Sequence, residues 1–239
     1  MGIFAGKKTT NATGGTASFV GQYTVHLFTS SGTFTPASTG FIDVLAIGAG
    51  GDCGVSLQYP SGGGGAGAVV YRKFLRVAGS TSYPVIVGNT SGATTIFNAP
   101  AVGVTSVTAF GGGAGGAGGG FSGGNAPNAS GGGGGGGGGL AGVGFGASTF
   151  GYPGGNGSAA SPHRGAGGGG GAGGVGDVGS NTQPGLGGAG TPIAYFTGNP
   201  TDIVSTGGGR LTTPALYGNG GQSNVPGTSR PGAIYVRYI

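Results

Sequence analysis

The chain has 239 residues, of which 69 are glycine, 36% are hydrophobic and only 5% are charged. This glycine usage is roughly four times the average and excludes an ordinary helical or α/β domain. The net charge is +5, but the basic residues do not gather beyond Lys7-Lys8 and Arg72-Lys73. A nucleic-acid surface needs a denser basic stripe, so no nucleic-acid partner is expected.

Residues 1–17 are small and polar, and they predict an N-terminal arm that attaches the protein to its assembly. The arm carries Lys7 and Lys8 but lacks the apolar stretch of a secretory signal, so we expect a protein that is not secreted by that route. No run of about 18 apolar residues occurs in the sequence, and no membrane span is expected.

Residues 18–110 predict β structure. Tyr23 to Thr29 is rich in aromatic and branched residues, and Ser30-Ser31-Gly32 is a hairpin-type break before Phe34. Phe41 to Ile47 is almost entirely apolar, which indicates a strand buried on both faces. Further strands are expected at Ala68–Val77, Tyr83–Val87, Thr94–Phe97 and Val104–Phe110. Short strands at this spacing are typical of a sandwich or barrel.

The last segment, residues 232–239, returns to strand chemistry. Ile234, Val236 and Tyr238 alternate with a second set of residues. This set is Tyr235, Arg237 and Ile239, and the alternation predicts a strand whose two faces have different surroundings. We therefore predict an all-β fold. Residues 18–110 and 232–239 form an antiparallel β-sandwich, and residues 111–231 are an insertion that leaves the sandwich and returns to it.

The insertion is predicted to be a bundle of polyglycine-II helices, which have three residues per turn and no internal hydrogen bonds. Their amides need partners on adjacent chains, and only glycine allows backbones to approach from all sides. Residues other than glycine should then recur every third position on an outward edge, as Ala166, Ala172, Val175 and Val178 do. The run Gly131 to Gly139 is expected at the centre. A disordered linker is the alternative, but the chain is poor in charge and contains aromatic residues.

Segments of Pro, Asn, Ser and Thr with aromatic residues separate the glycine runs and predict display loops. The residues expected to contact a receptor are Phe150, Tyr152, His163, Arg164, Tyr195, Phe196 and Tyr217. Tyrosine beside small polar residues is the composition of adaptable recognition loops. Alternatively, these aromatic rings only cap the ends of the bundle.

The residue types that carry catalysis are sparse. The carboxylates are Asp43, Asp52, Asp177 and Asp202, and none has an obvious partner. His26 and His163 have no companion at metal-ligand spacing. Cys53 is the only cysteine and is interpreted as a structural thiol. We expect a protein that is not an enzyme and that has no cofactor and no metal.

Five short motifs follow one another in a characteristic order. They are Phe28-Thr-Ser-Ser-Gly-Thr-Phe-Thr-Pro36, Asp43-Val-Leu-Ala-Ile-Gly-Ala-Gly-Gly51, Ala68-Val-Val-Tyr71, Ser82-Tyr-Pro-Val-Ile-Val-Gly88 and Pro231-Gly-Ala-Ile-Tyr-Val-Arg-Tyr238. This order resembles glycine-rich tail-fibre and tail-tip proteins of bacteriophages. The glycine runs also look like those of the fibre-tip adhesins of T-even-like phages. This chain departs from those adhesins in its sizeable β segment and in having no tryptophan.

The resemblance implies a receptor-binding tip in the virion, made in the host cytoplasm. It implies two kinds of partner, namely other tail-fibre proteins and a host-surface glycan or outer-membrane protein. It also implies a homo-oligomer, for example a trimer, or a cap on a trimeric fibre. A purely structural fibre, baseplate or capsid-decoration component is an alternative. An ice-binding protein is a further one, although the disulfides usual there are absent.

Overall fold

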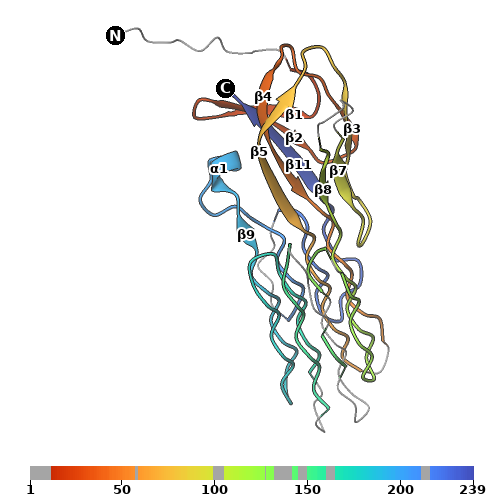
Figure 1. Cartoon of the computed structure of the whole chain (residues 1–239). Coiled ribbons are helices and arrows are strands. Elements are labelled where there is room, and N and C mark those ends of the chain that lie inside the picture. Colours follow the sequence, from red (N-terminus) through yellow and green to blue (C-terminus); the bar gives the residue numbers. More distant parts are fainter. Residues whose placement is uncertain are drawn as a thin grey trace.

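The structure is a computed structural model, and it describes residues 12–56, 59–98, 105–126, 128–131, 142–144, 150–159, 165–210 and 216–239. The molecule is elongated, with a β-sandwich at one end and a bundle of extended segments at the other (Figure 1). Every strand pairing is antiparallel. The predicted all-β sandwich with an inserted bundle is confirmed.

Two sheets form the sandwich. The five-stranded sheet has the order β1 (Thr16–Val20), β2 (Tyr23–Phe28), β11 (Ala233–Tyr238), β4 (Gly40–Ile47) and β5 (Val69–Val77). The four-stranded sheet has the order β3 (Gly32–Phe34), β6 (Tyr83–Ile86), β7 (Thr95–Phe97) and β8 (Val107–Ala109). The C-terminal strand therefore lies between two N-terminal strands, where Val236 is level with His26 on one side and Val44 on the other. The pairing expected of this strand is confirmed.

The five-stranded sheet is buried on both faces near its centre. Its inner face packs on the other sheet, with Val44 and Val236 against Phe34 and Phe97. Its outer face, which includes Leu45, is covered by an excursion from the bundle that holds β9 (Thr191–Pro192), α1 (Ala194–Thr197) and β10 (Ile203–Val204). The apolar run of β4 thus faces two cores, as its composition predicted.

Two local predictions are wrong. The break after β2 does not make a hairpin, because β11 occupies the position beside β2 while β3 pairs with β6 in the other sheet. The expected arm also overlaps β1, which pairs with β2 through a tight turn at Gly21, whose φ is +60°. Residues 1–11 lie outside the described residues.

The bundle is held by backbone hydrogen bonds with a period of three residues. Along residues 62–68, successive N–H groups donate to three different neighbouring segments in turn. The pairs are Gly62 to Gly116, Gly63 to Gly167, Gly64 to Gly221, Gly65 to Gly113, Ala66 to Gly170, Gly67 to Gly218 and Ala68 to Phe110. Every third N–H group thus donates to the same neighbouring segment, as expected for polyglycine II, which has three residues per turn.

Residues 62–68 form the central segment of the part of the bundle that the structure describes. Their carbonyl groups accept hydrogen bonds from three further places, namely segment 48–54, Ser130 and Gly208. Six neighbours surround this segment, although we expected residues 48–68 in the sandwich. Of the run expected at the centre, only Gly131 is described, and residues 132–139 lie outside the described residues.

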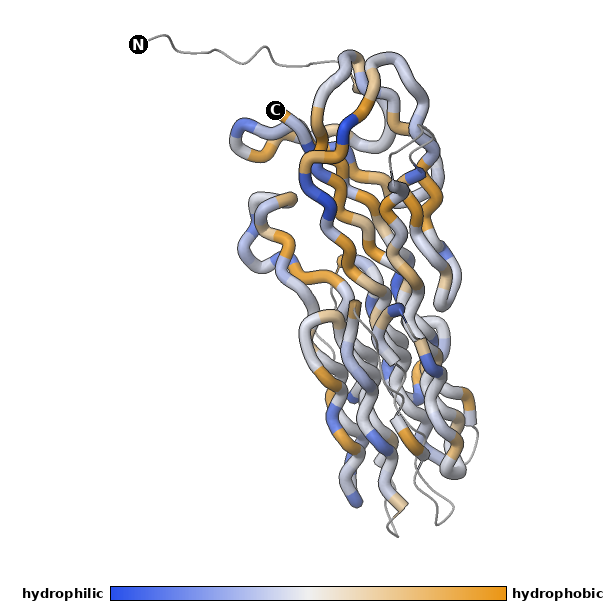
Figure 2. The backbone as a smooth tube through the Cα atoms, viewed as in Figure 1, coloured by the Kyte–Doolittle hydropathy of each residue, from blue (hydrophilic) through white to orange (hydrophobic). Residues whose placement is uncertain are grey.

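Side chains are excluded from the interior of the bundle and return at its surface. A Cβ on Gly64 would lie 1.9 Å from the carbonyl oxygen of Gly51. Val175 and Val178 are exposed, as the spacing of three predicted, but Ala166 is buried. Its segment, 165–172, is itself enclosed by other segments, which explains the difference. In Figure 2 the apolar positions are most frequent in the sandwich, whereas the bundle is mostly pale, with scattered apolar and hydrophilic positions.

Replacing an interior glycine with alanine should destabilise the protein. Gly64→Ala places a methyl group against a backbone oxygen that cannot move alone, and we expect a loss of about 1–3 kcal/mol or more. Gly174→Ala is the matched control, since the nearest atom to its new Cβ is 3.4 Å away. The control should be neutral or slightly stabilising, because alanine restricts the unfolded chain. Urea unfolding measures both variants, and equal tolerance would contradict the packing described above.

Candidate functional site

Three of the residues expected to contact a receptor meet in one open hollow between the sheet and the bundle. Phe150, Tyr152 and Tyr195 line it, together with Tyr71 of β5, which the sequence analysis did not single out. Its volume is about 520 Å³, within the size range of pockets that bind small ligands. Phe150, Tyr152 and Tyr195 are each 40–44% exposed, so their rings are available to a partner.

The backbone of Tyr152 is fixed by the bundle. Its carbonyl accepts a hydrogen bond from Gly131 N–H at 3.2 Å, and its own N–H donates to Ser130 Oγ at 3.4 Å. Gly170 packs so closely on the same carbonyl that a Cβ there would lie 1.9 Å away. The tyrosine ring is therefore presented from a rigid segment.

Tyr195 is fixed from the opposite side by the sheet. It lies on α1, and its carbonyl accepts a hydrogen bond from the guanidinium of Arg237 on β11. Its ring packs on Tyr71 with 5.4 Å between the ring centroids. Two tyrosines from distant parts of the sequence thereby form one continuous wall.

A charged network lies behind this wall. Asp43 Oδ2 accepts hydrogen bonds from the Tyr71 hydroxyl at 2.8 Å and from Arg237 Nη2 at 3.0 Å. Arg237 Nη2 also donates to the Tyr71 hydroxyl oxygen at 2.8 Å. The guanidinium carbon lies 4.6 Å from the ring centre of Tyr23 and 4.7 Å from that of Phe196, so aromatic faces enclose the cation.

These contacts shift the protonation equilibria of the network. Burial by itself would raise the pKa of Asp43. Hydrogen bonds from Phe74 N–H, Tyr71 and Arg237 outweigh it, and the pKa lies below its ordinary value. Burial and the hydrogen bond to Asp43 raise the pKa of Tyr71 to about 12. Burial also raises the pKa of Tyr195. Both hydroxyls stay protonated at neutral pH, and the hollow acts as a neutral, hydrogen-bonding aromatic surface.

Of the remaining expected residues, Phe196 and Tyr217 do not line the hollow. Phe196 is fully buried in the outer core, so the expectation that it contacts a receptor is wrong. It sits on a short helix over β11 and not in a free loop, because it closes the outer face of the sheet. Tyr217 is partly buried against the same core, near Tyr235. His163 and Arg164 lie outside the described residues.

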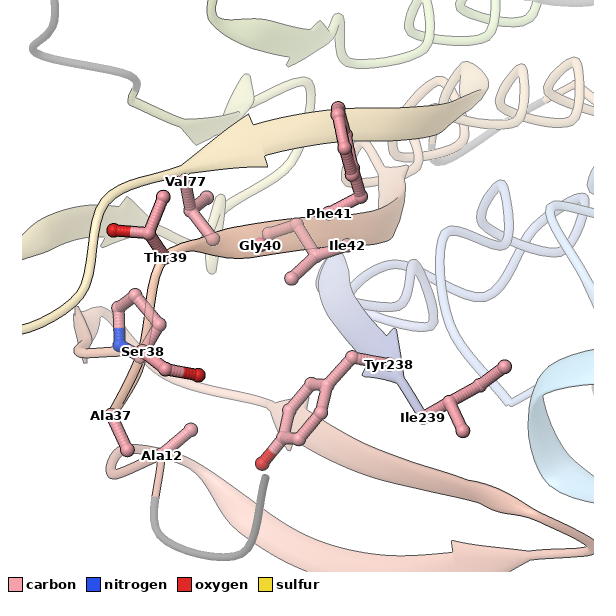
Figure 3. Close-up of a pocket in the computed structure, with 11 residues that line it drawn as sticks. Ala12, Ala37, Ser38, Thr39, Gly40, Phe41, Ile42, Val77, Tyr238 and Ile239 are labelled. Carbon is pink, nitrogen blue, oxygen red and sulfur yellow. The ribbon is translucent and has the colours of Figure 1, made fainter. Parts of the chain in front are cut away.

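A second, smaller pocket of about 110 Å³ lies at the end of the sandwich far from the bundle (Figure 3). Ala12, Phe41, Tyr238 and Ile239 are among the residues that line it. The Tyr238 hydroxyl is already hydrogen-bonded to His26 Nε2 at 3.0 Å. None of the expected receptor residues lines this pocket, and the aromatic hollow is the better candidate.

Sequence reasoning named Asp43 as a carboxylate without an obvious partner, and it missed the partners Tyr71 and Arg237, which lie far from it in the chain. Two indications were available in the sequence. Asp43 is a charged residue within the apolar run of β4, and Arg237 is a charged residue within the apolar C-terminal strand. Only the pairing of β4 with β11 brings the two charges together. Among the described residues, no group of three or more His, Cys, Asp or Glu could hold a metal ion. No helix in the described ranges has the length and apolar character to span a membrane.

Residues 29–235 match the family model described as a glycine-rich domain. The chain belongs to this glycine-rich domain family. The match begins just after β2 and ends within β11, so it covers the bundle and the strands from β3 to β10, but not β1 and β2. No curated protein matches the chain.

Removing the charge of Asp43 should destabilise this glycine-rich domain in a pH-dependent way. Asp43→Asn weakens several hydrogen bonds to a carboxylate, and we expect a loss of roughly 1–3 kcal/mol at pH 7. The pKa of Asp43 is lower in the folded state than in the unfolded state. Its stabilisation is therefore fully present above about pH 4 and is lost as the pH falls through the folded value.

The difference between the wild type and Asp43→Asn should accordingly shrink below about pH 4. Chemical unfolding at several pH values measures this difference. Asp177→Asn, at an exposed carboxylate on the bundle, serves as the control and should change stability little. A difference between wild type and Asp43→Asn that is independent of pH would contradict the assigned network.

Proposed function

We propose that this protein is the receptor-binding tip of a bacteriophage tail fibre and that it acts by binding, without catalysis. The order of its strand motifs and glycine segments supports this proposal, since it resembles that of tail-fibre and tail-tip proteins. The observation that carries the proposal is the aromatic hollow. Phe150 and Tyr152 come from one segment of the bundle and Tyr195 comes from α1, yet all three are partly exposed around one opening.

The hollow has the physical properties of a recognition surface. Tyrosine rings present flat apolar faces to a sugar ring or to an apolar side chain, while their hydroxyls remain hydrogen-bonded. The backbones that carry Tyr152 and Tyr195 are already ordered by the bundle and by Arg237. Binding therefore requires little further loss of conformational entropy, which favours affinity.

The proposed partners are a host-surface glycan or outer-membrane protein on one side and other tail-fibre proteins on the other. The proposal places the protein in the virion after synthesis in the host cytoplasm. Homo-oligomeric assembly as a trimer, or capping of a trimeric fibre, is part of the same proposal, because fibre components are usually symmetric.

Alanine substitutions in the hollow should separate receptor binding from folding. Tyr152→Ala and Tyr195→Ala each remove a half-exposed ring, and adsorption of particles to host cells should fall about tenfold or more. The melting temperature should change by less than about 3 °C. Tyr217→Ala is the comparison variant, because its ring packs on the outer core, and it should lower the melting temperature by more than about 4 °C.

Adsorption and thermal melting, measured on the same preparations, distinguish a loss of receptor binding from a loss of folding. Normal adsorption by both folded hollow variants would refute the proposal and favour a purely structural role in the virion. Activity in a freezing assay, with no effect on adsorption, would instead support the ice-binding alternative.

A further inference from the structure

Phe74 on β5 adopts a backbone conformation that is unfavourable for its side chain. Its φ is +54°, in the left-handed region that bulky residues rarely occupy. The conformation arises at a bulge, where Ile42 is paired with Leu75 and Val44 with Arg72, so that Lys73 and Phe74 together face Asp43. Left-handed residues with side chains persist only where the surroundings fix them, and they cluster at functional positions.

The surroundings do fix this residue. The N–H of Phe74 donates to Asp43 Oδ1 at 3.0 Å, while Asp43 Oδ2 is held by Arg237 and Tyr71. The side chain of Asp43 is largely buried, so its position is well defined. The network behind the hollow thus also holds the bulge in its strained form.

The strain is not explained by packing of the core. Phe74 is 74% exposed, more than any other large hydrophobic residue in the described ranges. Phe41, directly opposite Arg76 in the register, is 63% exposed. A bulge that merely ended strand pairing would not require an aromatic residue at the left-handed position, where glycine or asparagine fits better.

Positive charges flank these two aromatic residues. Lys73 and Arg76 are both exposed, and Lys73 Nζ lies 5.3 Å from the centre of the Tyr71 ring. Within the part of the chain that the structure describes, the guanidinium group of Arg76 forms no ion pair and no hydrogen bond. Figure 2 shows β5 as hydrophilic stretches on either side of a hydrophobic one. We call the four residues Phe41, Lys73, Phe74 and Arg76 the β5 patch; Arg72 is excluded because its register partner, Val44, faces the inner core.

We propose that the β5 patch binds an anionic lipid surface. Each cation near such a surface contributes roughly fivefold to the partition coefficient. The exposed phenylalanine rings supply apolar area that enters the boundary between headgroups and acyl chains. Charged residues on an edge strand also prevent unwanted strand pairing, which would account for the cations. That role does not account for two exposed phenylalanines, one of them strained.

This inference does not depend on the proposed receptor role of the hollow. The β5 patch is a second contact surface. It lies farther along β5 than Tyr71, the residue of this strand that lines the hollow. Lipid contact there would hold the molecule with its β5 edge against a bilayer, whichever molecule the hollow recognises.

Co-sedimentation of the full chain with vesicles tests the proposal. The probes are vesicles of equal parts phosphatidylglycerol and phosphatidylcholine, and vesicles of phosphatidylcholine alone. The wild type should bind the anionic vesicles and not the neutral ones, and binding should weaken as the salt concentration rises. Lys73→Gln should lower the partition coefficient about fivefold.

Phe74→Gly is the decisive variant. Glycine accepts the left-handed conformation, so the melting temperature should rise while binding to anionic vesicles falls about tenfold or more. Phe74→Asn provides a second variant that also tolerates this conformation. The matched controls are Phe121→Ser for an exposed aromatic residue and Arg230→Gln for an exposed charge, and neither should change vesicle binding.

Wild-type protein that does not prefer anionic vesicles would overturn the proposal, and so would Phe74→Gly protein that binds as the wild type does. A lower melting temperature for both Phe74 variants would refute the assigned strain. If vesicles are not bound but Phe74→Gly still reduces adsorption to cells, the patch contacts a protein and the lipid proposal is wrong. Tyr152→Ala should bind vesicles normally, so a failure of the receptor proposal can be told apart from a failure of this one.

Discussion

The structure depends on direct contact between backbones, without side chains between them. In the bundle, each N–H group along residues 62–68 finds a carbonyl on one of three neighbours, and the period of three repeats without interruption. Each such bond contributes only about 0.5–1.5 kcal/mol net, and glycine loses much conformational entropy when it is ordered. Many bonds must therefore form together, which explains why so many segments surround one centre.

The sandwich sets the register of the bundle. Ile47 and Val69 form the last pair of β4 and β5, and the next bond along the same two chains joins Gly48 N–H to the Ala68 carbonyl. Sheet pairing thus passes into the bundle without a break. A core of ordinary apolar residues can fix the relative position of two strands through side-chain packing. The glycine segments that continue from β4 and β5 therefore begin at a fixed position relative to each other.

The candidate site lies where these two kinds of order meet. Tyr152 is placed by glycine backbones, whereas Tyr195 is placed by a helix that covers the sheet. Asp43 connects the hollow with the β5 patch. One carboxylate oxygen accepts a hydrogen bond from Tyr71, which lines the hollow, and the other accepts one from the strained Phe74. The two proposed contacts, one with a receptor and one with a lipid surface, consequently rest on the same buried ion pair with Arg237.

The sequence by itself determined those features that arise from local pattern. The apolar run of β4 and the alternation of β11 indicated their strands, and the scarcity of charge with abundant glycine indicated a bundle instead of a coil. The three-residue spacing of Val175 and Val178 places them on one edge of their helix, and both are exposed. These features depend on neighbours in the chain, which a single sequence displays directly.

Only the tertiary structure decided which segments meet. Backbone hydrogen bonds are the same for every glycine, so nothing in the sequence could show that residues 62–68 lie amid six neighbouring segments. The burial of Phe196 and the pairing of Asp43 with Arg237 depend on long-range sheet pairing and on the return of the chain over the outer face. Contacts between residues far apart in the chain follow from the packing of whole segments, and short patterns do not encode them.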